Sequence, residues 1–176
     1  MNIIYQVQVE LLKIDIGSII GKRDVCIDFS MQTTSELLGF LDNKISIISD
    51  IIVSGQVKND FESYVVTGII KFSAASECDR CLDKFEHCYE IEFTEKFVHD
   101  DHTDGDDVFV IRDNVADLSV AVLENIHINI PVKLLCNDEC KGLCSECGDN
   151  FNERQCRCGE DKINPQFAKL AKLINN

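Results

Sequence analysis

Six of the ten cysteines in this chain fall within one short stretch, CNDECKGLCSECGDNFNERQCRC, which runs from Cys136 to Cys158. Cys144 and Cys147 have two residues between them, the spacing with which a tight turn presents two thiolates to one metal ion. A second pair, Cys156 and Cys158, follows after eight residues. Four sulfur ligands favour zinc, and a site closed by four protein ligands has no open position for water. These residues therefore predict a structural zinc site at Cys144, Cys147, Cys156 and Cys158.

Four more cysteines have the spacing of metal ligands. Cys78 and Cys81, in ECDRCLDKF, repeat the two-residue spacing, and Cys136 and Cys140 have three residues between them. Together these four can form a second zinc site that ties the C-terminal part of the chain to its middle. Two other arrangements are consistent with the spacing. Cys78 and Cys81 can be unliganded thiols, or Cys140 can join the pair at 144 and 147.

The remaining cysteines and the histidines give no catalytic arrangement. Cys26 and Cys88 lie in strand-like runs and are predicted to be buried small hydrophobic side chains. A cysteine nucleophile needs a base close to its thiol, but His87 is adjacent to Cys88 in a strand, where neighbouring side chains point to opposite faces. The other histidines are in an acidic loop or a predicted apolar helix: His99, His102 and His127. We therefore expect a protein that is not an enzyme.

The charge of the chain is uneven. Residues 1–130 hold 10 Lys and Arg against 24 Asp and Glu, whereas residues 131–176 hold 7 of each, so the first part carries the whole formal charge of −14. Binding to a nucleic-acid backbone relies on Lys and Arg, and zinc held by four thiolates adds about −2 per site. We therefore expect weak or no binding to naked RNA, and a basic protein as the partner.

The sequence shows no signal for a membrane. No apolar run approaches the roughly 20 residues that span a bilayer, and the stretch MNIIYQVQVELLKIDIG lacks the basic and apolar regions of a secretory signal. We therefore expect a cytoplasmic protein with no membrane partner. Thiols stay reduced in that compartment, which favours metal ligation over disulfides.

Alternating apolar residues predict an antiparallel β body. Strands are expected at residues 3–12, 25–29, 51–57, 66–74, 89–97 and 108–111. The runs at 51–57 and 66–74 should form a hairpin with one buried face, joined by a polar turn at 58–60. Gly55 and Gly68 lie inside these runs, which indicates bulges or close packing.

Helices are predicted at two places. Asp117 occupies an N-cap position before LSVAVLENIHINI, which gives a mostly buried helix near residues 117–130 that ends before Pro131. Asn164 and Pro165 open a C-terminal helix with apolar residues at helical spacing, expected to dock on its own domain. A turn of helix at 37–41 and a solvated acidic loop at 99–107 are also expected.

The order of these pieces resembles the YceD family, also called large ribosomal RNA subunit accumulation protein. The resemblance covers roughly residues 45–176. It implies a role in the accumulation or processing of large-subunit ribosomal RNA and carries over no catalytic residue. The matching positions are Cys78-Asp-Arg-Cys81-Leu82 with Phe85, the strand to Phe97, the acidic loop, Asp117-Leu118, Pro131-Val132, the run LLCNDECKGLCSECGDNFNERQCRC, and Asn164-Pro165-Gln166-Phe167-Ala168-Lys169-Leu170.

We therefore expect an α+β protein in two parts. Residues 1–130 should form an acidic antiparallel β-sheet or barrel-like body with one central helix. Residues 131–176 should form a Cys-rich zinc-knuckle appendage with a C-terminal helix. The expected function is that of a non-enzymatic ribosome-biogenesis factor that holds structural zinc and binds ribosomal proteins or an immature large subunit. The alternative is a thiol switch that releases zinc and forms disulfides on oxidation.

Overall fold

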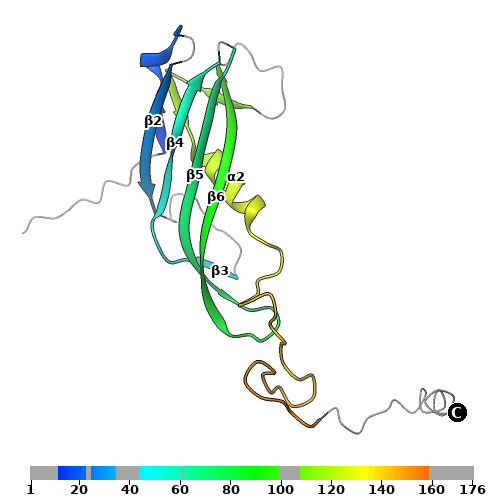
Figure 1. Ribbon diagram of the computed structural model, residues 1–176. Coiled ribbons are helices and arrows are strands. Elements are labelled where there is room, and N and C mark those ends of the chain that lie inside the picture. The colour runs from blue at the N-terminus through cyan, green and yellow to red at the C-terminus, as the bar shows by residue number, and fades with distance from the viewer. Residues whose placement is uncertain (1–11, 23–24, 35–43, 61, 100–107, 159–176) are drawn as a thin grey trace, which may run out of the picture.

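The computed structural model describes residues 12–22, 25–34, 44–60, 62–99 and 108–158 (Figure 1). The turn of helix expected at 37–41 and the C-terminal helix lie outside the described residues. The strand expected at 3–12 and the acidic loop expected at 99–107 also lie outside them, except for Leu12 and for His99, which is the last residue of a strand. Within them, β-strands dominate and α2 (Ser119–Asn129) is the one α-helix. No helix in these ranges is both long and apolar enough to cross a membrane.

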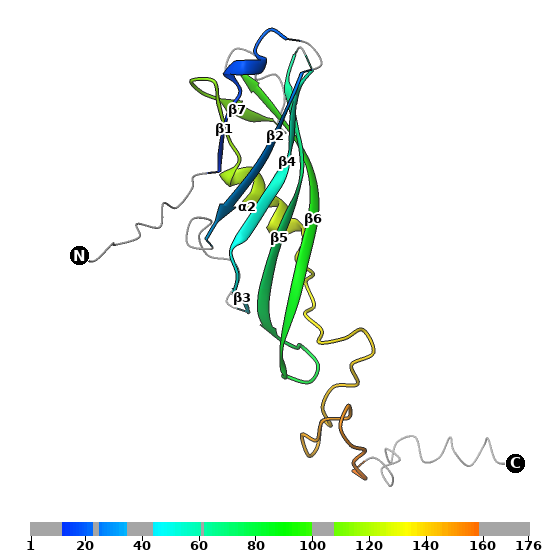
Figure 2. The same cartoon turned by 60° about the vertical axis from the view of Figure 1, so that its left-hand side comes forward.

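The main sheet has six strands (Figures 1 and 2). Five of them lie in the order β2-β4-β5-β6-β7, and the sixth, β3, pairs with β5 beyond the first residue of β4. The lower halves of β5 and β6 project beyond α2 as a long hairpin that points toward the cysteine-rich segment. These strands are β2 (Cys26–Thr33), β3 (Ile45–Ile47), β4 (Ile51–Asn59), β5 (Tyr64–Glu77), β6 (Lys84–His99) and β7 (Phe109–Ile111). A smaller sheet pairs β1 (Lys13–Asp15) with β8 (Val115–Asp117).

β4 and β5 form the predicted hairpin, which confirms the expectation for residues 51–57 and 66–74. The antiparallel register is continuous, with Val53 opposite Ile70 and Val57 opposite Val66. All four side chains are fully buried. Because strand residues alternate between faces, the other face of the hairpin meets solvent.

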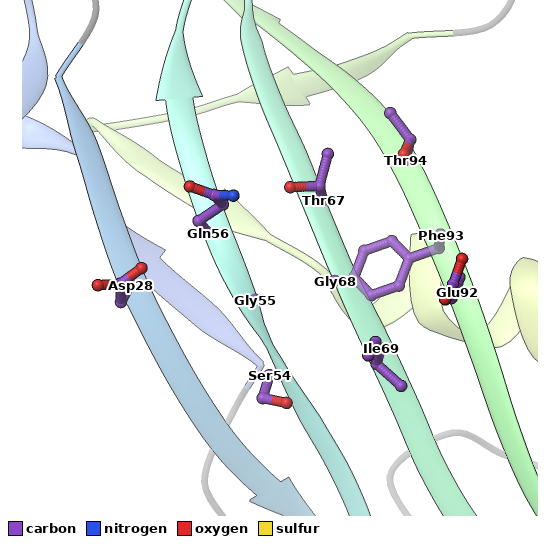
Figure 3. Close-up of a pocket in the computed structure, with 10 residues that line it drawn as sticks. All are labelled: Asp28, Ser54, Gly55, Gln56, Thr67, Gly68, Ile69, Glu92, Phe93 and Thr94. Carbon is purple, nitrogen blue, oxygen red and sulfur yellow. The ribbon is translucent and has the colours of Figure 1, made fainter.

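Gly55 and Gly68 stand directly opposite each other in this register. A Cβ at Gly55 would lie 2.0 Å from the carbonyl oxygen of Thr67, and one at Gly68 would lie 2.6 Å from that of Ser54. The glycines therefore permit a close approach of the two backbones, and because neither strand has an extra residue here they are not bulges. A shallow hollow of about 520 Å³ lies over this part of the sheet (Figure 3).

The core lies between one face of the main sheet and a layer formed by α2, the β1–β8 pair and a short 3-10 helix, η1 (Gly17–Ile19). α2 contributes the buried residues Ala121, Val122 and Ile126 and packs against β6. The opposite face of the sheet is polar and exposed, as at Asp28 and Glu92. The apolar alternation of the strands thus decides which face the helix covers.

Three features of the body differ from the expectation. The fold is predominantly β, and the sheet is open rather than barrel-like, because its outer strands β2 and β7 do not pair with each other. α2 and the β1–β8 pair occupy the space that a closing wall would need. In addition, β7 runs parallel to β6, with Phe97 opposite Phe109, whereas we expected only antiparallel strands.

The helix begins later than predicted. Asp117 is the last residue of β8, so its backbone is extended, and α2 starts at Ser119 with Leu118 at the N-cap position. The Asp117 carboxylate still accepts a hydrogen bond from the Ser119 N–H (3.0 Å), which satisfies one of the free amides of the first turn. The helix ends at Asn129, before Pro131, as predicted.

The prediction that Cys26 and Cys88 are buried is wrong, because both side chains are exposed. Neighbouring strand residues point to opposite faces, and Ile27 and Tyr89 take the inward positions. The Cys88 Sγ lies 3.4 Å from the Ser73 Oγ on the neighbouring strand.

Candidate metal centres

The structure gathers eight cysteines into two groups of four. Within each group all four sulfur atoms lie within 4.8 Å of one another. In the first group two of the sulfur–sulfur distances are 3.8 and 3.7 Å. Four sulfurs placed tetrahedrally at roughly 2.3 Å from a zinc ion are about 3.8 Å apart, so this arrangement fits zinc. We call Cys78, Cys81, Cys136 and Cys140 cluster 1, and Cys144, Cys147, Cys156 and Cys158 cluster 2.

The same turn presents the first two ligands of each cluster. The segments Cys78–Asp83 and Cys144–Asp149 share the pattern Cys-x-x-Cys-x-Asp. In each turn the N–H after the second cysteine donates to the carbonyl of the first cysteine, at 2.9 Å in both cases. The N–H of the first cysteine donates to the carbonyl of the aspartate, at 2.9 and 2.8 Å respectively. The two clusters are therefore built on a repeated backbone unit.

The residue after the second cysteine has a positive φ in both turns, 62° at Leu82 and 76° at Gly148. Glycine adopts this conformation freely, whereas for other residues it costs roughly 1–2 kcal/mol. Leu82 is exposed, so apolar burial of its side chain does not offset that cost. The turn at cluster 1 keeps its shape through the hydrogen bonds and packing around it.

Backbone amides point at the first sulfur of each turn. Burial raises the pKa of Cys78, but hydrogen bonds from backbone N–H groups, led by that of Cys81, outweigh burial and bring the pKa down to about 6. The N–H groups of Cys147 and Glu146 lower the pKa of Cys144 to about 7. Metal is bound by the thiolate form, so each turn stabilises one ligand in the form that a metal needs.

The pKa of the second cysteine of each turn is raised, whereas that of the first is lowered. Burial raises the pKa of Cys81. The Asp149 N–H lowers the pKa of Cys147, but burial and the neighbouring sulfur of Cys144 raise it to about 12. Several thiolates in one cluster repel one another, and a bound cation would remove that repulsion.

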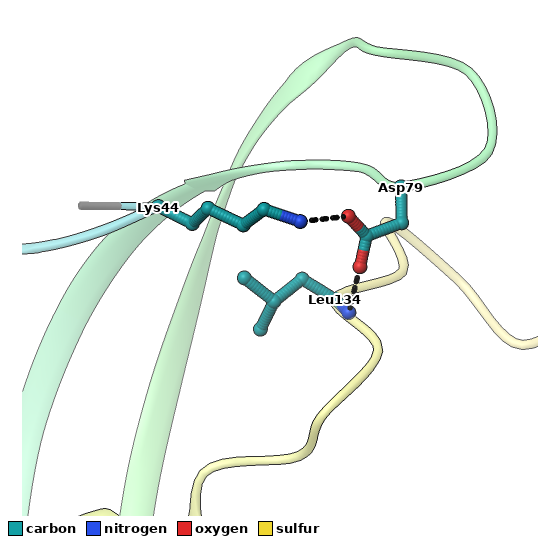
Figure 4. Close-up of polar contacts among 3 residues, drawn as sticks. All are labelled: Lys44, Asp79 and Leu134. Carbon is teal, nitrogen blue, oxygen red and sulfur yellow. Dashed lines mark hydrogen bonds and ion pairs between the residues drawn. The ribbon is translucent and has the colours of Figure 1, made fainter. Parts of the chain in front are cut away.

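Asp79, inside the first Cys-x-x-Cys turn, joins the two halves of cluster 1 (Figure 4). One carboxylate oxygen contacts the Lys44 Nζ at 2.9 Å, and the other accepts the Leu134 N–H at 2.9 Å. The Asp79 N–H donates in turn to the Leu134 carbonyl (2.8 Å). The Lys44 ammonium, followed by the Leu134 N–H, lowers the pKa of Asp79. Because Leu134 lies two residues before Cys136, these contacts hold the second pair of ligands against the first.

Arg80 reinforces this junction. Its guanidinium donates to the Cys140 carbonyl at 2.7 Å and to the Asp138 carbonyl at 3.4 Å. Gly142 packs against the same residue, because a Cβ there would lie 3.1 Å from the Arg80 carbonyl oxygen. Position 142 also has a φ of 74°. Glycine therefore suits this position because it lacks a Cβ and because it adopts a positive φ freely.

Asn152 connects the two clusters. It lies in the loop between the two cysteine pairs of cluster 2, yet its side-chain amide donates to the Cys140 Sγ of cluster 1 (3.3 Å). Its side-chain oxygen accepts the Lys141 N–H at 2.8 Å. Asn150, in the same loop, donates to the Asp83 carboxylate (2.8 Å). The loop that carries cluster 2 is thus bonded to a ligand and to the first turn of cluster 1.

The sequence placed these cysteines in pairs but left their grouping open. The structure brings Cys78 and Cys81 against Cys136 and Cys140, and it places Cys140 outside the group that contains Cys144. Metal ligation by either cluster stays a prediction. Asp79, Arg80 and Asn152 were missed, since nothing in their local sequence shows that they contact residues far away along the chain.

An open β-sheet with one covering helix, followed by two clusters of four cysteines, defines this chain as a β-sheet protein with two candidate metal centres. The chain belongs to the YceD family. The family model described as "Large ribosomal RNA subunit accumulation protein YceD" matches residues 66–174, a span that contains both clusters. The resemblance seen in the sequence is thereby confirmed.

Relatives of this chain occur in several bacteria and in plants. It is 29% identical over 155 residues to the uncharacterized protein YlbN of Bacillus subtilis, an alignment that covers 83% of this chain and 88% of YlbN. It is 27% identical over 124 residues to an uncharacterized protein of Mycobacterium tuberculosis, covering 68% of this chain and 59% of that protein. The chain thus spans about three fifths of the length of its mycobacterial relatives.

A plant relative carries a functional name. The chain is 33% identical over 57 residues to "Large ribosomal RNA subunit accumulation protein YCED homolog 1, chloroplastic" of Arabidopsis thaliana, covering 32% of this chain and 18% of that protein. No solved structure matches this chain.

Proposed function

We propose that this protein is a non-enzymatic factor in the biogenesis of the large ribosomal subunit, which promotes accumulation of the large-subunit ribosomal RNA. The observation that carries this proposal is membership of a family named for that role. The name of the Arabidopsis relative states the same role for that protein.

We further propose that clusters 1 and 2 each hold a structural zinc ion. Support comes from the sulfur spacing and from the repeated turn that directs amides at one sulfur of each cluster. Four protein sulfurs complete a tetrahedral zinc, so neither site would keep a position for a substrate or a reactive water. A structural role therefore suits these sites better than a catalytic one.

The partner that we propose is a basic ribosomal protein or an immature large subunit, met in the cytoplasm. The support is the formal charge of −14, which attracts Lys- and Arg-rich proteins and repels phosphates. All ten cysteines are free of disulfides, a state that suits a reducing compartment.

We expect the purified protein to bind a basic ribosomal protein and to bind naked RNA weakly. At about 150 mM salt, where charges are screened beyond about 8 Å, filter binding with a large-subunit rRNA fragment should give little retention. A pull-down from lysate treated with nuclease should still recover ribosomal proteins, because the contact is with protein. Tight RNA binding together with loss of the ribosomal proteins after nuclease would contradict the proposal.

In cells, removal of the protein should lower large-subunit rRNA relative to small-subunit rRNA.

We expect Asn152→Asp to weaken metal binding at cluster 1. The change replaces a donor to the Cys140 sulfur with a negative charge, and losing a hydrogen bond to a metal ligand typically lowers metal affinity about 10- to 100-fold. Cadmium loading followed by cadmium NMR resolves the two sites, and a competing chelator should remove cadmium first from cluster 1. Glu153→Gln, at the exposed neighbouring position, serves as the control. Equal retention at cluster 1 in both variants would show that Asn152 does not support the ligand.

A further inference from the structure

The outer edge of β6 lacks a strand partner along most of its length. β6 pairs with β5 on one side from Lys84 to Phe97, but on the other side it pairs with β7 only from Phe97 to His99. In the described part of the chain, residues 84–96 therefore have no strand partner on this side and form a free edge of the sheet. At about 3.3 Å per residue this edge is about 40 Å long. A free edge presents unpaired N–H and C=O groups to which another strand can bind.

A groove of about 620 Å³ runs beside this edge, between β6 and the chain that follows α2. One wall carries Phe85, Tyr89 and Ile91 of β6, and the other carries Pro131, Leu134 and Leu135. Tyr89 is anchored there, because its ring stacks on Phe72 with centroids 5.0 Å apart. The groove therefore has apolar side chains on both walls and one fixed wall, and polar residues also line it: His87, Glu90, Asn129, Lys133 and Asp138.

Apolar side chains are also exposed where the chain leaves α2. Ile128 is 80% exposed and Val132 is 98% exposed, and both are sequence neighbours of residues that line the groove. These are among the most exposed large apolar side chains of the described residues. Single exposed apolar residues are ordinary, and these two stand next to groove-lining residues along the chain.

The other face of the same strand is acidic. Glu86 and Glu92 occupy exposed positions that alternate with Phe85 and Ile91, whereas the exposed Glu90 also lines the groove. Lys71 forms an ion pair with Glu90 at 3.0 Å. Glu86 and Glu92 have no ion pair with any other described residue. The free edge thus has a groove with apolar side chains on both walls on one side, and the carboxylates of Glu86 and Glu92 on the other.

We propose that the free edge of β6 binds an extended segment of a basic partner, in which apolar residues alternate with Lys or Arg. The segment would add a strand to the sheet through main-chain hydrogen bonds. Its apolar side chains would enter the groove, and its basic side chains would meet Glu86 and Glu92, because successive residues of a strand point to opposite faces. This inference rests on the proposed function in one respect, that the partner is basic, and it adds the surface and the pattern of the partner.

The test uses the full chain and a short synthetic peptide of alternating valine and lysine, labelled for fluorescence anisotropy. We expect saturable binding that falls roughly tenfold in Glu92→Lys, a loss of about 1.4 kcal/mol. The matched control is Asp28→Lys, which makes the same change of charge at an exposed position on β2, and it should bind nearly as well as the unmodified protein. Val132→Ser should also weaken binding, without a cost in core packing. Hydrogen exchange should show protection of amides at 85–95 on peptide addition and none at 26–33.

Each contrary outcome has a distinct meaning. An equal loss in Asp28→Lys and Glu92→Lys would show general attraction by charge, and would overturn the edge as the binding surface. Equal binding of a peptide of alternating valine and glutamate would overturn the basic pattern. Protection of 85–95 that depends on protein concentration alone would assign the edge to a second copy of the chain. Recovery of ribosomal proteins without any peptide binding would overturn this inference and leave the proposed function standing.

Discussion

Replacing any one ligand of cluster 2 with serine, for example Cys144→Ser, is expected to unfold the segment 141–158 and to leave the β body and cluster 1 folded. Little apolar surface is buried in this segment, where the buried or half-buried side chains are mainly the cysteines themselves, Leu143 and Phe151. The folding free energy must therefore come from metal binding, which supplies on the order of 10 kcal/mol in small zinc domains. The core of the body is a separate set of residues, so it should survive the loss.

Metal analysis of the reduced protein comes first and should find two zinc ions per chain. Limited proteolysis should then cut the Cys144→Ser variant within 141–158, while thermal unfolding of the β body shifts little. Cys88→Ser is the control, because Cys88 is exposed and belongs to neither cluster. A protein without stoichiometric metal, or an ordered segment after all four cysteines of cluster 2 are changed, would contradict the prediction.

The same zinc-loaded protein can be used to distinguish a structural site from a redox switch. A structural site keeps its zinc under mild peroxide, whereas a switch releases zinc and forms disulfides. A folded β body without the cysteine segment would also support the division of the chain near residue 130, which stays a prediction.

Replacing Gly55 with alanine is expected to destabilise the β body strongly. The added Cβ would lie 2.0 Å from the Thr67 carbonyl oxygen and 2.5 Å from the Gly68 Cα. Both are backbone atoms at the centre of the sheet, so two paired strands would have to separate. Overpacking of a core costs about 1–3 kcal/mol where side chains can adjust. Because backbone must move here, we expect a loss of about 3 kcal/mol or more, at the high end of single substitutions.

Urea unfolding followed by circular dichroism measures this loss. Gly17→Ala is the matched control, because a Cβ there meets only the side chain of Asp15, which is flexible and exposed. Its midpoint should stay close to that of the unmodified protein. If Gly55→Ala unfolds at the same urea concentration as Gly17→Ala, the close approach of β4 and β5 is not needed for stability.

Local patterns in the sequence determined much of the body. Alternation of apolar residues was enough to place the β4–β5 hairpin and its buried face, because a strand with one side in the core must alternate. The same reasoning misplaced Cys26 and Cys88, since a run of strand residues does not state which of two faces is buried at each cysteine. The sequence could not predict that β7 runs parallel to β6, because the direction of a strand depends on how the chain returns to the sheet.

The candidate site divides in the same way. The spacing within Cys78-x-x-Cys81 and Cys144-x-x-Cys147 follows from the geometry of one short turn, so the sequence alone determined that these pairs can chelate a metal. The grouping of Cys78 and Cys81 with Cys136 and Cys140 was decided by tertiary structure, because it depends on where the β5–β6 hairpin ends relative to the chain after α2. Asp79 and Arg80 hold that junction across more than fifty residues of sequence. Contacts of this length are set by the packing of whole elements, which no local spacing encodes.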